Sequence, residues 1–201
     1  MKDNYMGCVI TLIMKKIIQR IRSLATWPVI LFFLTLTLLF AFVLFPAFTK
    51  EVKAIAGMEM KSVDASLFPG AKTVANIVNM FKEQNIAEVY IRTEIQKDLA
   101  FPFIYAILLF LLLAAVYLKW KIAIKPEWII LIPFVTTVAD LLENVMVIYM
   151  LRSAESVYGN ATSVCAVANA IKFGSLFLCV GLLAVGLVWN MVKILGGKSV
   201  S

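Results

Sequence analysis

Two carboxyl groups stand near the centre of an apolar stretch, residues 129–151 (IILIPFVTTVADLLENVMVIYML). A helix places residues three or four positions apart on one face, so Thr136, Asp140, Glu143 and Asn144 are expected to lie together. An acidic side chain in hydrocarbon costs about 2.5 kcal/mol or more, so this face should turn away from lipid. Candidate chemistry therefore lies at these four residues, directed towards a partner, a water-filled cavity or a ligand.

Several kinds of chemistry fit such a pair. Two close carboxyl groups disfavour double ionisation, and a shared proton leaves one negative charge. That charge suits the cationic or hydroxyl-rich head of a lipid or small amphiphile. The pair would also suit an intramembrane acid/base enzyme, or a proton or cation relay. No nucleophile motif supports the enzyme, and the apolar runs at residues 107–116 and 182–187 show no polar path for a relay.

The remaining alternative is structural, with the acidic face joining helices in a membrane subunit or a partner-binding protein. Hydrogen bonds to Tyr105, Thr136 or Ser175 would then fix the register of the bundle. Such bonds average only about 0.6 kcal/mol in lipid, which compensates poorly for two buried ionisable groups. We therefore prefer lipid or amphiphile binding, and the structural alternative stays open.

Three residues from other stretches join the candidate binding set. Counting about 1.5 Å per residue from opposite ends of antiparallel helices puts Tyr105 at the depth of Glu143. Lys172 is the only basic residue near the interior side of an apolar stretch. It could turn towards Glu143, but four methylenes reach the interface readily, so we expect Lys172 to snorkel to the outer surface. Asp98 precedes an apolar stretch, where it would mainly stabilise a helix N-terminus.

The composition indicates which elements carry these residues. Of 201 residues, 62% are hydrophobic and only 15% are charged, too apolar for an ordinary soluble domain. Four stretches approach the roughly 20 residues that cross a bilayer: 28–48, 99–118, 128–151 and 172–192. We predict an all-α integral membrane protein, a single four-helix bundle with an outer segment over residues 49–98.

Charge and tryptophan predict the same orientation. The formal net charge of +7 comes from residues before the first stretch, between the second and third, and after the fourth, whereas residues 49–98 hold seven basic and seven acidic residues. The positive-inside rule then puts both termini in the cytoplasm. All four tryptophans lie at the cytoplasmic ends of the stretches. The basic character is thus explained without a nucleic-acid partner; membrane lipids are the expected partners, and a homo- or hetero-oligomer stays open.

The positions of the cysteines and the absence of histidine from the sequence disfavour two further classes of protein. Cys8, Cys165 and Cys179 would lie inside, near the outer face and within the membrane, so no pair is placed to form a disulfide. There is no CxxC motif and no histidine. A thiol–disulfide oxidoreductase and a His-ligated metal or haem centre are both disfavoured, and no cofactor is predicted.

Periodicity predicts helices outside the four stretches. Residues 9–24 read either as a basic amphipathic helix on the membrane surface or as a charged flank that fixes orientation. In the outer segment, Val74, Ile77, Val78 and Phe81 form one apolar face of a short helix. Residues 89–95 alternate like a strand, but a lone strand would lack a partner, so we predict helix there too.

Two motifs resemble a known group. Residues 98–105 (DLAFPFIY) and 133–144 (PFVTTVADLLEN) resemble the DxxFPxxY and P-x6-DxxEN patterns of an uncharacterised family of small bacterial four-span membrane proteins. The resemblance covers about residues 72–151. It implies a four-span protein of the bacterial inner membrane and brings no activity. It also implies that six motif residues belong together: Asp98, Pro102, Tyr105, Asp140, Glu143 and Asn144.

Overall fold

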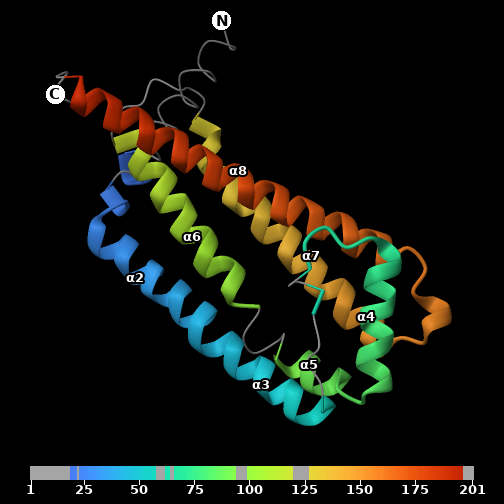
Figure 1. Cartoon of the computed structure of the whole chain (residues 1–201). Helices are drawn as coiled ribbons and strands as arrows, with labels where there is room; N and C mark the ends of the chain where they lie inside the picture. The colour runs from blue at the N-terminus through green and yellow to red at the C-terminus, as the bar shows by residue number, and fades with distance from the viewer. Residues whose placement is uncertain are drawn as a thin grey trace, which may run out of the picture.

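The computed structural model describes residues 19–21, 23–57, 62–63, 66–93, 99–119 and 127–196, and this part of the chain is all-α (Figure 1). Four helices are long and apolar enough to cross a membrane: Trp27–Ile55, Phe101–Leu118, Ile129–Arg152 and Ala161–Leu195. The prediction of an all-α bundle of four apolar helices is confirmed, and the chain is an integral membrane protein.

The first apolar helix continues past Pro46 and past the predicted end at residue 48, as far as Ala56. The chain runs through α2 (Trp27–Leu39), the π-helical turn η1 (Phe40–Leu44) and α3 (Phe45–Ala56). A proline removes one helical N–H, and a π turn is one way in which a helix accommodates the break. The helix ends at Gly57, whose φ of 71° is the left-handed conformation that glycine adopts readily.

The other three apolar helices follow the outer segment. They comprise α6 (Phe101–Leu113) with the π-helical η3 (Ala114–Lys119), the 3-10 turn η4 (Glu127–Leu131) with α7 (Ile132–Arg152), and α8 (Ala161–Leu195). Pro28, Pro102 and Pro133 are each the second residue of their α-helix, where the missing N–H has no helical partner anyway. α8 begins at Ala161 rather than at the predicted residue 172. Its 35 residues span about 50 Å, more than a bilayer core.

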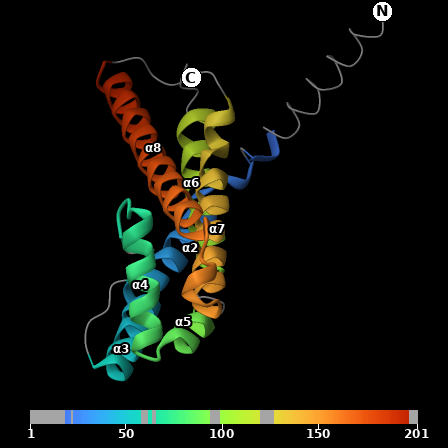
Figure 2. The same ribbon diagram turned by 90° about the vertical axis from the view of Figure 1, so that its right-hand side faces the viewer.

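The bundle has two inner and two outer helices. We compare how much of the most apolar 18-residue segment of each helix is buried. The buried share is 50% for Phe101–Leu118 and 56% for Ile129–Arg152, against 6% for Trp27–Ile55 and 11% for Ala161–Leu195. α7 packs most extensively against α8, and α6 packs against α2 and α7 (Figures 1 and 2). Most of the apolar surface of α2 and α8 therefore faces outward, as expected in lipid.

One end of the bundle is covered by the outer segment, and we call it the capped end. α4 (Ala71–Glu83), α5 (Ala87–Thr93) and the end of α3 gather there, opposite the end at which α8 finishes (Figures 1 and 2). The predicted apolar face of α4 is confirmed, since Val74, Ile77, Val78 and Phe81 are all buried. The helix predicted from residue 89 onward is confirmed as far as Thr93.

Polar side chains fix this cap to the turn between α7 and α8, which contains η5 (Glu155–Val157). Asn79 of α4 donates to Glu155 Oε1 at 2.8 Å and accepts from the Tyr158 hydroxyl at 2.8 Å. Lys82 donates to the carbonyl of Ser153 and lies 4.8 Å from the Tyr158 ring centre. The outer segment is thus anchored to the helices that carry the acidic face.

Several predictions fall outside the described residues. The amphipathic helix at residues 9–24 is described only at 19–21 and 23–24, which are helical. Asp98 and residues 120–126, most of the loop between the second and third apolar stretches, are also outside the described residues.

Candidate functional site

The polar face of α7 turns into the protein, as its spacing predicts. Thr136, Asp140, Glu143 and Asn144 are all buried, and Asp140 and Glu143 expose only 2% and 0% of their surface. Each buried charge loses several kcal/mol of hydration, so the partners of the two carboxylates decide what the site can do.

Lys172 of α8 supplies a compensating charge. Its Nζ lies 2.7 Å from Asp140 Oδ1 and 3.1 Å from Glu143 Oε2, and the residue is 9% exposed. The prediction that Lys172 snorkels to the surface is therefore wrong. Because α8 starts at Ala161, Lys172 lies inside the packed part of a helix. From there its ammonium reaches two carboxylates that would otherwise be buried without a cation.

The first part of the site, which we call the Asp140 half, consists of Asp140 and Tyr105. The Tyr105 hydroxyl on α6 donates to Asp140 Oδ2 at 2.7 Å. Asp140 Oδ1 accepts no hydrogen bond from any described residue, because its Lys172 contact is an ion pair without hydrogen-bond geometry. The depth count that puts Tyr105 beside this face is supported, and Asp140 Oδ1 has an ion pair but no hydrogen bond within the described residues.

The second part, the Glu143 half, consists of Glu143 and Asn169. Glu143 Oε1 accepts from Asn169 Nδ2 at 2.9 Å, and Oε2 accepts from Lys172 at 3.1 Å. Asn169 Nδ2 also donates to the Ser66 carbonyl at 3.2 Å, and its Oδ1 accepts from the Phe68 N–H at 3.1 Å. Asn169 thus ties Glu143 to the strap, our name for residues 66–70 of the outer segment.

Asn169 is absent from the candidate set drawn from the sequence. One signal was available, because Asn169 lies three residues before Lys172 and on the same helical face. The partners of Asn169 in the strap are about one hundred residues distant in sequence, so no local pattern reveals them.

The other candidates lie at the edge of the site or outside the described residues. The Thr136 and Ser175 hydroxyls are 2.7 Å apart and join α7 to α8 on the side of the ion pairs that is further from the capped end. Asn144 is buried on the same face of α7. Thr137 donates to the Pro102 carbonyl at 3.1 Å, so the two motif-bearing helices meet. Asp98 is not described.

A cavity of about 390 Å³ borders the Asp140 half. Its wall comes from four helices and is polar only at Thr37, Tyr105, Asp140 and Lys172. The complete lining is Thr37, Phe45, Phe101, Tyr105, Leu108, Leu109, Asp140, Lys172, Phe173 and Leu176. Glu143 and Asn169 are not among these residues, so the cavity meets only one half of the site.

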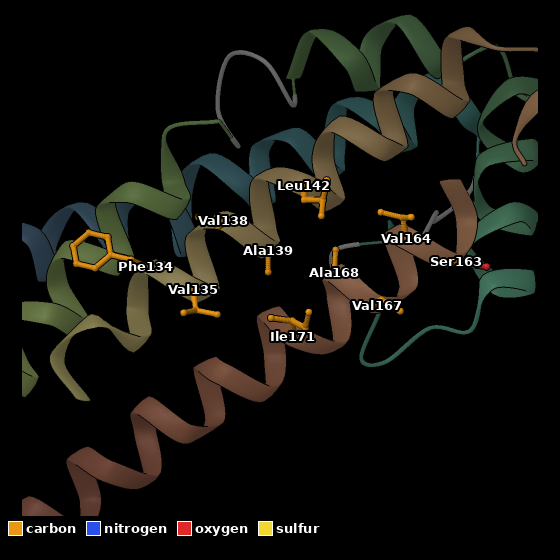
Figure 3. A pocket seen from close by; sticks show the side chains of 10 residues that line it. All are labelled: Phe134, Val135, Val138, Ala139, Leu142, Ser163, Val164, Val167, Ala168 and Ile171. Atoms are coloured by element: carbon orange, nitrogen blue, oxygen red, sulfur yellow. The ribbon is translucent and has the colours of Figure 1, made fainter. Parts of the chain in front are cut away.

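A larger groove of about 660 Å³ runs between other faces of α7 and α8 (Figure 3). Figure 3 shows its side chains, which are hydrocarbon except for the hydroxyl of Ser163. Val135, Val138 and Val167 in its wall are more than half exposed. A groove without polar groups gives a ligand no orientation beyond that of a lipid chain.

The electrostatics of the site are unbalanced. When both acids are ionised, Asp140 and Glu143 carry two negative charges against one positive charge on Lys172. Charges interact more strongly at low dielectric, so an extra cation is favoured here and an anion is disfavoured. The arrangement can therefore hold a polar or cationic group against Asp140.

No family model, no curated protein and no solved structure matches this chain.

Proposed function

We propose that this integral membrane protein binds a lipid or small amphiphile in the cavity beside the Asp140 half. The observation that carries the proposal is the cavity wall, which joins a polar end, Tyr105, Asp140 and Lys172, to an apolar body. A few convergent polar groups in a mostly apolar cavity of 300 Å³ or more are typical of small-molecule sites.

The direction of the cavity fits an amphiphile. Leu109 follows Tyr105 by one helical turn on α6, and Leu176 follows Lys172 by one turn on α8. Both helices run from the capped end inward, so each leucine lies about 6 Å further from the cap than its polar neighbour. A bound amphiphile would have its head near the cap and its chain towards the middle of the bundle.

The cavity also has a route for entry. Phe45, Phe101, Phe173 and Leu176 are only partly buried, so the side wall of the cavity is not sealed. A ligand that enters from the bilayer keeps its chain in hydrocarbon throughout. We place the capped end outside and both termini in the cytoplasm of a bacterial inner membrane, on the charge and tryptophan patterns and the family resemblance. The head would then lie in the outer leaflet.

The motif resemblance stays part of the proposal. The Tyr105–Asp140 hydrogen bond and the contact of Thr137 with Pro102 support a common role for the two motifs. Asp98 keeps its place in this proposal from the sequence alone.

A second function, helix joining in a structural or partner-binding subunit, is favoured by one observation. Asn169 binds both the strap and Glu143, and neither Asn169 nor Glu143 lines the cavity. We assign this structural role to the Glu143 half and ligand binding to the Asp140 half.

Filling the cavity tests the proposal. Leu176→Trp places an indole in the cavity, whereas Leu142→Trp makes the same change in the apolar groove on the other side of α7. Both variants and the parent are purified in a neutral detergent, and retained lipids are measured by native mass spectrometry. We expect Leu176→Trp to lose a lipid or amphiphile that Leu142→Trp and the parent retain. Equal retention in all three proteins would contradict the proposal, provided that their thermal unfolding midpoints agree.

A further inference from the structure

We infer that the cavity selects an amphiphile with a protonated amine as its head, and that the ammonium N–H donates to Asp140 Oδ1. This inference rests on the proposed function and adds the chemical class of the ligand. Three independent features carry it: the charge of the site, the open oxygen of Asp140 and the aromatic wall.

The first feature is charge. Lys172 bridges two buried carboxylates and can neutralise only one of them. An ammonium in the cavity adds a second positive charge, so that two carboxylates meet two cations: Lys172, which keeps its hydrogen bond to Glu143 and its contact with Asp140, and the ligand beside Asp140. A neutral head leaves the negative charge in place, and a phosphate or sulfate increases it. Charge balance therefore ranks a cation above a neutral head and an anion last.

The second feature is the state of Asp140. Its Oδ2 accepts a hydrogen bond from the Tyr105 hydroxyl. Its Oδ1 lies 2.7 Å from Lys172 Nζ but accepts no hydrogen bond from the described residues, although Asp140 is 2% exposed and lines the cavity. Buried carboxylate oxygens normally accept hydrogen bonds. A donor that enters the cavity meets this open position, and a charged donor makes the stronger bond.

The third feature is the aromatic wall of the polar end. Phe45, Phe101, Tyr105 and Phe173 all line the cavity. The Phe101 ring centre lies 4.9 Å from that of Phe45 and 5.2 Å from that of Tyr105, so three rings form one continuous surface. The faces of aromatic rings attract cations, and clustered rings are a recurring means of recognising ammonium groups.

Three probes with one chain length test the inference on the unmodified protein: dodecylammonium, dodecanol and dodecyl sulfate. Binding is measured at neutral pH in phosphatidylcholine nanodiscs, with empty nanodiscs subtracted. We expect dodecylammonium to bind at least about tenfold more tightly than dodecanol, a difference of about 1.4 kcal/mol, and dodecyl sulfate to bind least. Equal binding of the amine and the alcohol, or preference for the sulfate, would overturn the inference.

Variants locate the preference and separate this inference from the proposed function. Asp140→Asn should reduce the preference for the amine over the alcohol to about threefold or less, and Leu142→Ala, in the apolar groove, should leave it at tenfold. If Asp140→Asn does not fold, Phe101→Leu serves instead and should weaken amine binding about threefold more than alcohol binding. Unchanged preference in a folded Asp140→Asn or in Phe101→Leu overturns the inference. If the alcohol binds as well as the amine and Leu176→Trp abolishes both, the amine inference fails while the proposed function stands.

Discussion

Asp140 and Glu143 lie one turn apart on α7, yet the two carboxylates have different surroundings. Both oxygens of Glu143 accept hydrogen bonds, one from Asn169 and one from Lys172, and Asn169 continues to the strap. Asp140 lines the cavity, and within the described part of the chain it accepts one hydrogen bond, from Tyr105, while its other oxygen has only the ion pair with Lys172. This difference is the basis of our proposal that Glu143 holds the fold and that Asp140 meets a ligand.

The largest effect should come from removing the cation that both halves share. Lys172→Met leaves two buried carboxylates without Lys172, and breaking a buried ion pair on one side costs about 3 to 5 kcal/mol. The loss is measured by unfolding titration in mixed micelles. Lys193→Met is the matched control on α8, since Lys193 is only partly buried near the far end, and it should change stability by about 0.5 kcal/mol or less. A similar loss of stability in Lys172→Met and Lys193→Met would mean that Lys172 does not join the Asp140 half to the Glu143 half.

The next effect concerns the Glu143 half alone. Asn169→Leu removes the partner of Glu143 Oε1, the Ser66 carbonyl and the Phe68 N–H together, and should destabilise the protein by about 2 to 3 kcal/mol. Asn190→Leu is the control, because Asn190 is also buried on α8 and donates to one carbonyl of its own helix, that of Gly186.

A local measurement accompanies the unfolding titration. Amide hydrogen exchange at Phe68 should become faster in Asn169→Leu and stay unchanged in Asp140→Asn, since that N–H donates to Asn169 Oδ1. Unchanged exchange in Asn169→Leu would show that the strap is held by something else, and the assignment of Glu143 to a structural role would fail.

A smaller effect distinguishes the two halves energetically. Tyr105→Phe removes the hydrogen bond to Asp140 Oδ2 and should cost about 1 kcal/mol. In an Asp140→Asn background the cost should fall by about 0.5 kcal/mol or more, because the two residues interact directly. In an Asn169→Leu background it should stay the same within error. Coupling of Tyr105 to Asn169 as strong as to Asp140 would mean that the site is one undivided network.

The sequence predicts those features that depend on local periodicity. The three- and four-residue spacing of Thr136, Asp140 and Glu143 is enough to place them on one buried face of a helix, and the apolar face of α4 follows by the same reasoning. The depth of Tyr105 follows from counting residues, because helices of known direction have a fixed rise. The two buried faces need no knowledge of the other helices, and the depth of Tyr105 needs only the relative direction of two of them.

Features that depend on distant contacts escape prediction. The sequence predicts the wrong position for Lys172 because apolar character begins near residue 172, whereas α8 begins at Ala161 and packs on α4. The role of Asn169 depends on the strap, which only the folded chain brings near. The cavity arises where side chains of four helices meet, so neither its volume nor its border on Asp140 alone follows from any local pattern.

The most direct test of the division between the halves compares Asp140→Asn with Glu143→Gln, the same chemical change one turn apart. Asp140→Asn leaves Lys172 paired with Glu143, so we expect stability within about 1 kcal/mol of the parent and loss of the retained amphiphile. Glu143→Gln weakens a charge-assisted bond to Lys172 and should cost about 1.5 to 3 kcal/mol while the amphiphile is retained. Unfolding titrations and native mass spectrometry of the two purified proteins give both quantities. Equal destabilisation with equal retention would contradict the account, as would loss of the amphiphile in Glu143→Gln alone.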